Sequence, residues 1–334
     1  MLKIRHFEPS DNEYAEICRV HNLEWPKHPS TVRSYTWGDE NWNNNYLFQR
    51  FVAELDGKMI VEGAYYVPFW SFTHGKFQMG WSLDPAYIDY KEDGKGIHQQ
   101  MYDYVLSELA DRNPTLLSTS TREDKQDRLD FLAANGFEFQ MRYPESELAV
   151  DEFDFTPYDG LSAKLAEKGI EISTLDKLME SDPNWLNKIY ELCWDIYQDV
   201  PSPDPPAKES LEEWQKGLKS PNFLNKGCFV AVDTNIDARN YQETDGRGDY
   251  VGVSMLEKDE VLPEKMHTSL TGVGRSHRRQ GVATAMKLKS IELAKGRGAK
   301  TISTGNEENN PMYQLNVRLG FKPKPAWADY HKIL

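Results

Sequence analysis

The stretch "TGVGRSHRRQGVATAMK", Thr271 to Lys287, carries four Lys or Arg side chains and one histidine around Gly281. The chain as a whole is acidic, with 53 Asp and Glu against 39 Lys and Arg and a formal net charge of −14. A strand-like run, "HTSLTGV", leads into the stretch, and a helical pattern starts at about Gly281. The order strand, glycine turn, helix predicts a mixed α/β fold with an anion site at the start of the helix.

The positive charge around this turn predicts a diphosphate site. Between Thr271 and Lys300 there are eight Lys or Arg and one acid. Arg278 and Arg279 match phosphate oxygens, and a glycine at position 281 lets a ligand approach the backbone closely. Lys287 and Lys289 are expected to add charge around the turn. The simpler alternative is a surface turn whose arginines only contact solvent.

A second, weaker copy of the same pattern occurs in the first half of the chain. Gly94 and Gly281 are 187 residues apart, and the Gly-Phe pairs at Gly136 and Gly320 are 184 apart. We therefore expect a duplicated domain, divided as residues 1–155 and 156–334. The window 91–120 has three Lys or Arg and five Asp or Glu, so we expect the first turn to repel a multiply charged anion.

Strand patterns support the duplication. "FVAELDGKMIVEGAYYV" (51–67) is two apolar runs around Asp56-Gly57, a hairpin signal, and "GCFVAVD" with "DYVGVSMLE" forms a similar pair in the second half. The stretch 143–160 has no helical periodicity, and we expect the last strand of the first domain and the linker there. Each half then predicts a mixed sheet flanked by helices.

Composition excludes several classes of protein. The negative charge argues against nucleic-acid and anionic-membrane partners, and no apolar run is long enough to cross a bilayer. The three cysteines, Cys18, Cys193 and Cys228, are far apart, and no Cys/His pair has metal-ligand spacing. We expect a soluble cytoplasmic protein without a structural metal, present as a monomer or homodimer.

The motif Arg278-x-x-Gly281-x-Ala283 resembles the Gln/Arg-x-x-Gly-x-Gly/Ala signature of the GNAT N-acetyltransferases. The strand before it and the later "NNPMYQLNVRLGF" also match this family in order and spacing. The resemblance covers both halves, so it implies a tandem GNAT protein of the α+β class, with mostly antiparallel sheets. The first half matches less well: Lys91-x-x-Gly94-x-Gly96 lacks the arginine, and His98 stands where a small residue is usual. This implies a degenerate N-terminal domain.

The resemblance also implies acetyl-CoA as cosubstrate, with catalysis in the second domain. The N–H of Val273 should polarise the thioester carbonyl, and Asn309 matches the position that contacts the pantetheine arm. The pyrophosphate should meet the turn beside Arg278, at the backbone of Arg279, Gln280, Gly281, Val282, Ala283 and Thr284.

The catalytic acid departs from the family pattern. Many members have Leu-Tyr where this chain has Leu315-Asn316, and the tyrosine protonates the departing thiolate. Tyr313 lies one turn earlier and is a candidate acid, although packing is an adequate role for it. Asn316 is a candidate for positioning a water or the substrate.

No residue is singled out as the general base. Glu257, Glu264 and His267 are candidates near strand ends, where a solvated side chain is the simpler explanation. Asp199, after a Trp- and Tyr-rich helix, is a candidate for binding a cationic amine, but a helix C-terminal turn also explains it. The resemblance favours acetyl transfer to a primary amine of a small molecule by direct attack. A CoA-binding sensor without catalysis remains the alternative.

Overall fold

A computed structural model describes residues 1–237 and 244–334, and they form two compact units. Unit 1 consists of Met1–Arg142, Ser202–Ala207 and Pro325–Leu334, and unit 2 of Tyr143–Pro201 and Lys208–Lys324. Part of the polar insert expected between the two strands of the second hairpin, residues 238–243, lies outside the described residues. Each compact unit contains segments from both halves of the chain. The division into domains 1–155 and 156–334 therefore stays a prediction.

Unit 1 is built on a seven-stranded sheet in the order β1-β2-β3-β4-β7-β16-β8, in which β4 and β7 are parallel. Its strands are β1 (Leu2–His6), β2 (Phe48–Leu55), β3 (Lys58–Tyr66), β4 (Lys76–Leu83), β7 (Leu116–Arg122), β8 (Glu138–Tyr143) and β16 (Trp327–Ile333). Its helices are α1 (Asp11–Glu24), α2 (Val32–Glu40), α3 (Ile97–Leu109) and α4 (Gln126–Ala134). The expected hairpin at Asp56-Gly57 is confirmed: Leu55 faces Lys58, and both turn residues have positive φ.

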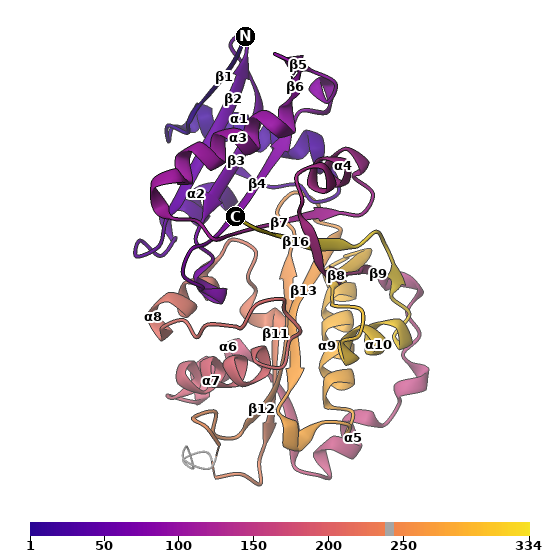
Figure 1. Ribbon diagram of the computed structural model, residues 1–334. Helices are drawn as coiled ribbons and strands as arrows, with labels where there is room; N and C mark the ends of the chain where they lie inside the picture. Colours follow the sequence, from indigo (N-terminus) through magenta and orange to yellow (C-terminus); the bar gives the residue numbers. More distant parts are fainter. Residues whose placement is uncertain (238–243) are drawn as a thin grey trace. The chain divides into compact units, whose positions relative to one another are not determined.

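Unit 2 repeats this plan, with the strand order β10-β11-β12-β13-β14-β9-β15 and a parallel pair β13 and β14. Its strands are β9 (Glu145–Ala149), β10 (Ile170–Thr174), β11 (Cys228–Asp233), β12 (Tyr250–Lys258), β13 (Lys265–Val273), β14 (Thr301–Gly305) and β15 (Lys322–Pro323). Its helices are α5 (Leu161–Ala166), α6 (Leu175–Ser181), α7 (Trp185–Tyr197), α8 (Leu211–Trp214), α9 (Val282–Gly296) and α10 (Pro311–Arg318). In unit 2, α6 and α7 cover one face of the sheet, and α9 and α10 cover the other (Figure 1). The predicted mixed, mostly antiparallel fold is confirmed for both units.

Each sheet contains a strand from the other half of the chain. β9 lies between β14 and β15 of unit 2, although it directly follows β8 of unit 1. Conversely β16, at the end of the chain, pairs along its whole length with β7 of unit 1, from Trp327 opposite Arg122 to Ile333 opposite Leu116. Neither sheet is therefore complete without a segment from the other half.

Within the described residues, no helix combines the length and the apolar character that crossing a bilayer requires. In the same part of the chain no group of His, Cys, Asp or Glu side chains is arranged to hold a metal ion.

Removing residues 325–334 should destabilise unit 1, because β16 is an interior strand of that sheet. We expect hydrogen exchange of the β7 amides to accelerate at least ~10-fold, since their neighbour on one side is lost. Mass spectrometry of exchange, peptide by peptide, measures this. A shorter truncation of Ile333 and Leu334 alone is the control, because these residues are exposed. Unchanged protection of β7 in the longer truncation would contradict the role given to β16.

Candidate functional site

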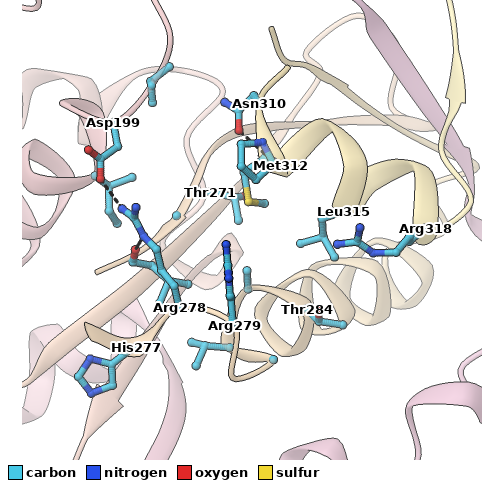
Figure 2. Close-up of a pocket in the computed structure, with 18 residues that line it drawn as sticks. Asp199, Thr271, His277, Arg278, Arg279, Thr284, Asn310, Met312, Leu315 and Arg318 are labelled. Carbon is cyan, nitrogen blue, oxygen red and sulfur yellow. Dashed lines mark hydrogen bonds and ion pairs between the residues drawn. The ribbon is translucent and has the colours of Figure 1, made fainter. Parts of the chain in front are cut away.

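A cavity of about 420 Å³ opens in unit 2 where the C-terminal end of β13 meets the start of α9 (Figure 2). Its walls come from four places in the sequence: the end of α7, the end of β13, the turn into α9, and α10. The lining residues are Ile196, Asp199, Val200, Thr271, Gly272, Val273, His277, Arg278, Arg279, Gly281, Val282, Ala283, Thr284, Asn310, Pro311, Met312, Leu315 and Arg318.

One edge of β13 is open along this cavity. The parallel pairing of β13 with β14 covers only the first three residues of β13, ending with His267 opposite Ser303. On the other edge, the Gly274 N–H donates to the Val251 carbonyl at 2.8 Å, so the preceding residue, Val273, is in a non-hydrogen-bonded pair with β12. The N–H of Val273 therefore points away from β12, toward the side where β14 has separated.

Thr271 repeats this orientation two residues earlier. Backbone groups alternate along a strand, so the N–H of Thr271 points to the same side as that of Val273. A register shift between Ser254 and Leu256 of β12 marks a bulge just before this segment. Two backbone donors, the N–H groups of Thr271 and Val273, thus face the cavity. Only that of Val273 is predicted from the sequence.

The helix that follows supplies a second set of backbone donors. Gly281 caps α9 with φ of +89°, a conformation that L side chains rarely adopt, and no side chain caps the first turn. Arg279 also has positive φ, at 61°. The first-turn N–H groups of Val282, Ala283 and Thr284 have no acceptor within the helix, so they and the helix dipole favour an anion.

The arginines of the turn are partly neutralised. Arg278 donates from Nε to the Val273 carbonyl at 2.9 Å and pairs through Nη2 with Asp199. Arg275 pairs with the same carboxylate at 2.5 Å. These two guanidinium groups hold the pKa of Asp199 below its ordinary value. Figure 2 shows the Arg278 side chain directed at Asp199, with their ion pair drawn as a dashed line.

Comparisons with known proteins identify the domain that contains the cavity. Residues 186–321 match the Acetyltransferase (GNAT) family model, and this region includes β13, the turn and α10. Residues 186–321 therefore form a GNAT acetyltransferase domain. Among curated protein sequences no significant match is found.

Solved structures share the fold over the whole chain. A tandem GNAT protein from the clavulanic acid biosynthesis pathway, solved without AcCoA, is 16% identical with a TM-score of 0.72, over 100% of this chain and 98% of that one. A GCN5-related N-acetyltransferase from Sphaerobacter thermophilus is 14% identical with a TM-score of 0.65, covering 99% and 95%. A glucosamine N-acetyltransferase region of a fungal multi-domain β-N-acetylglucosaminidase is 14% identical with a TM-score of 0.69, covering 99% of this chain and 38% of that one. At these identities the likeness concerns the fold.

Four residues predicted for the GNAT site do not line the cavity. Gln280 turns back to the Ser276 carbonyl at 3.4 Å. Asn309 donates to Glu307 at 2.8 Å, and its neighbour Asn310 lines the cavity instead. Tyr313 is half-buried on α10.

Asn316, the fourth, is 1% exposed. Its amide donates to the Asn306 side-chain oxygen at 2.7 Å, while its own Oδ1 has no hydrogen-bond partner.

Sequence reasoning missed two ionisable residues of the cavity wall. His277 lies in the turn and contacts Asp233 through Nε2 at 2.8 Å, and this contact helps hold the pKa of Asp233 below its ordinary value. Arg318 is on α10, one turn after Leu315. The helical spacing of Leu315 and Arg318 was the available signal, because residues three apart share a face.

The expectation that Lys287 adds charge around the turn is wrong. Lys287 is 2% exposed, and its ammonium lies 5.5 Å from the centroid of the Phe321 ring. Burial lowers its pKa to about 7. Lys289 does lie at the surface, where it pairs with Glu292 at 2.9 Å.

The buried cysteines of unit 2 are poor nucleophiles. Burial raises the pKa of Cys193 well above its ordinary value and that of Cys228 to about 12. Neither is therefore a thiolate near neutral pH.

None of the three candidate bases, Glu257, Glu264 and His267, lines the cavity. Both ring nitrogens of His267 are engaged, with Asp259 at 2.9 Å and with Ser303 at 2.6 Å.

In unit 1 the glycine turn has a different structure. Lys91–Glu92 and Lys95–Gly96 pair as a small hairpin, β5 and β6, whose two turn residues, Asp93 and Gly94, have positive φ. The residue that precedes α3 is Gly96, with φ of −69°. The structural counterpart of Gly281 is therefore Gly96 and not Gly94. Glu92 accepts from the Leu2 N–H at 2.9 Å.

The open strand edge also has a counterpart in unit 1, but side chains occupy it. The Asp84 N–H donates to the Ile60 carbonyl, so Leu83 corresponds to Val273 and its N–H points away from β3. This N–H donates to Glu24 at 2.6 Å. Arg128 pairs with the same buried carboxylate and donates to the Trp81 carbonyl at 2.6 Å.

His98 fills the remaining space at the start of α3. Its ring accepts from the Trp81 indole at 2.9 Å and contacts Asp127 at 2.9 Å. The Phe131 ring lies 5.7 Å from both the Trp81 and His98 rings, measured between centroids. In unit 2 the helical position equivalent to His98 is the small Ala283.

Replacing Lys287 with methionine should stabilise the protein in a pH-dependent way. Between about pH 7 and an ordinary lysine pKa of about 10.4, the unfolded chain binds a proton that the folded chain does not, so stability rises with pH. Below about pH 7 the buried lysine lowers the free energy of unfolding by its full amount, on the order of 4 kcal/mol. Denaturant unfolding of both proteins from pH 6 to 10 measures the difference. We expect Lys287→Met to be the more stable at pH 6, with the gap narrowing toward pH 10. A gap that does not change with pH would contradict the buried ammonium.

Proposed function

We propose that this GNAT protein transfers an acetyl group from acetyl-CoA to a primary amine of a small molecule, in unit 2. The observation that carries the proposal is the meeting of two sets of backbone donors in one cavity. One set is the open edge of β13, at Thr271 and Val273, and the other is the first turn of α9. Together they match a ligand with a diphosphate at one end and a polar thioester arm at the other.

The diphosphate of acetyl-CoA is proposed to bind the turn from Arg278 to Thr284. The first-turn N–H groups and Gly281, with its positive φ, support this. Glycine has no side chain to keep phosphate oxygens away from the backbone donors. Arg279 and Arg318 line the same cavity and add charge. Val273 is proposed to donate its N–H to the thioester carbonyl, and one such donor is worth about 3 kcal/mol of transition-state stabilisation.

Transfer is proposed to be direct. The amine attacks the thioester carbon and the thiolate departs, without an acyl-enzyme, which the raised pKa values of the buried cysteines support. Tyr313 and Asn316 are the two proposals for the step that protonates the sulfur. The buried carbonyl of Asn316, which lacks a partner, favours a water held there. Asp199 is proposed to meet the amine, and it is already balanced by two arginines.

Unit 1 is proposed to bind no CoA. Its equivalent strand edge is satisfied by the Glu24 and Arg128 pair, and His98 occupies the start of its helix. Breaking a buried ion pair of this kind is strongly destabilising, so a ligand cannot displace it at little cost. Glu92, one of the acidic residues in the window 91–120, accepts a hydrogen bond from the Leu2 N–H.

One CoA should bind per chain, and Gly281→Ala should weaken its binding by at least ~10-fold. A Cβ at this position would lie 2.9 Å from the Leu161 Cδ1, in a backbone conformation that costs roughly 1–2 kcal/mol for alanine. Isothermal titration calorimetry with CoA gives both affinity and stoichiometry. The matched control is Gly96→Ala, whose Cβ would meet nothing within 4 Å at a negative φ. Two equivalent sites, or a loss of binding in the control alone, would refute the assignment.

The wild-type protein should release free thiol from acetyl-CoA in the presence of a suitable amine. Screening a library of primary amines with a thiol-reactive dye measures this directly, and mass spectrometry identifies the acetylated product. Gly281→Ala should reduce the rate in parallel with affinity. Tight CoA binding without thiol release for any amine would favour the alternative function, a CoA-binding sensor.

A further inference from the structure

A lysine is buried in the apolar core between α9 and α10. Lys287 lies four residues after Ala283 and four before Ile291, in the stripe of α9 that packs against α10. In the described part of the chain its ammonium forms no ion pair or hydrogen bond, and Phe321 is its aromatic neighbour. Lysine is almost never fully buried without a partner, so its surroundings carry information.

A row of hydroxyl groups crosses three strands on the same face of the sheet. Thr304 of β14 is opposite Ser146 of β9, and its hydroxyl donates to the Thr268 carbonyl of β13 at 3.3 Å. The residues two positions away on these strands pack against α9 in one core: Met266, Ile302 and Leu148. Because side chains alternate along a strand, the three hydroxyls also face α9.

Three buried oxygen atoms around this row have no hydrogen-bond partner among the residues that the structure describes: Thr268 Oγ1, Ser146 Oγ and Asn316 Oδ1. Their residues are 6%, 1% and 1% exposed. Buried polar atoms are nearly always satisfied, and a buried water with two to four polar partners is the usual means. Three such atoms and an ammonium on facing elements provide the partners that ordered water needs.

Three of the elements that carry these polar groups are also ones that line the cavity. On β13 this polar pocket lies at Thr268, three residues before Thr271, and on α9 at Lys287, one turn after Ala283. On α10, Asn316 directly follows Leu315. Each of the three elements that line the cavity therefore continues into the pocket, at the level where β13 and β14 separate.

We infer that the pocket holds water and that Lys287 supplies, through this water, the proton that the departing CoA sulfur takes up. This rests on the proposed acetyl transfer. The C–N bond forms and the C–S bond breaks, with its electron pair left on sulfur. One proton passes from the Lys287 ammonium through water to that sulfur. The new amide nitrogen loses its proton to solvent, and solvent returns one to the Lys287 amine.

The charges around Lys287 fit a group that gives up its proton near neutral pH. Burial lowers its pKa to about 7, and no carboxylate faces it from the packed elements. On β9, Glu145 and Glu147 flank Ser146 and so point to the opposite face, as His267 does on β13. Arg318 of α10 lies at the cavity. Lys287 is thus a positioned proton donor that acts through water.

The test is Lys287→Met, with Lys295→Met on the exposed face of the same helix as the control. We expect turnover to fall on the order of 10²-fold in the first variant, with CoA affinity within about twofold of wild type. Wild-type turnover should decrease as pH rises through neutrality, and Lys287→Met should lack this decrease. Unchanged turnover, or an unchanged pH profile, would overturn the proposal.

Thr268→Val provides a second test that does not alter the lysine, since valine replaces the hydroxyl with a methyl group of similar size. If water binds there, we expect turnover to fall about 10-fold without loss of CoA binding. A more stable variant with full turnover would mean a dry pocket and would overturn the proposal. So would loss of turnover in Tyr313→Phe together with full turnover in Lys287→Met, which would assign the proton to Tyr313.

Different results would refute acetyl transfer and proton delivery by Lys287. If wild-type protein binds CoA but releases no thiol with any amine, acetyl transfer is refuted and proton delivery with it. If thiol is released and Lys287→Met is as fast as wild type, acetyl transfer stands and only the role of Lys287 is refuted.

Discussion

The separation of β13 from β14 is the constraint on which the rest of the site depends. A strand in the middle of a sheet normally has both edges paired, and unpaired backbone groups are costly when buried. Here pairing ends at His267 and Ser303, which leaves the groups of Thr271 and Val273 directed into a cavity. Unit 1 has the same separation but satisfies it internally, because Glu24 and Arg128 bond to the strand edge that β7 leaves. The same backbone geometry thus leaves open backbone donors beside a cavity in unit 2, whereas in unit 1 a buried ion pair occupies the strand edge.

The exchange of strands joins the two halves of the chain through both sheets. β16 completes the sheet of unit 1 and β9 completes that of unit 2, so each sheet includes a strand that the other half of the chain supplies. β9 directly follows β8 in the chain, and it carries Ser146 and borders the core of α9 and α10.

Local sequence patterns predict much of the fold and part of the candidate site. The remaining features depend on how distant segments pack together. Gly281 and the arginines after β13 were found because a turn, a charge cluster and a helix start are adjacent in the sequence. The first-half equivalent was assigned to Gly94 because both turns contain glycine, whereas Asp93-Gly94 closes a hairpin and Gly96 begins the helix. Lys287 was counted as surface charge because a lysine is usually exposed. Only the contact of α9 with α10 shows it to be buried, and β9 reaches its position through strand exchange, which no local pattern encodes.

The buried lysine and the exposed arginines of α9 and its turn serve opposite electrostatic purposes. Arg278 and Arg279 keep their charge at any physiological pH and can offset the permanent charge of a phosphate. Burial in an apolar core instead disfavours the charged form of Lys287 and lowers its pKa to about 7. The lysine can therefore give up and regain a proton near neutral pH. A tyrosine with an ordinary pKa of about 10 is a weaker acid than such a lysine. In the proposed transfer, a chain with asparagine at the usual tyrosine position therefore takes the proton from Lys287 through water.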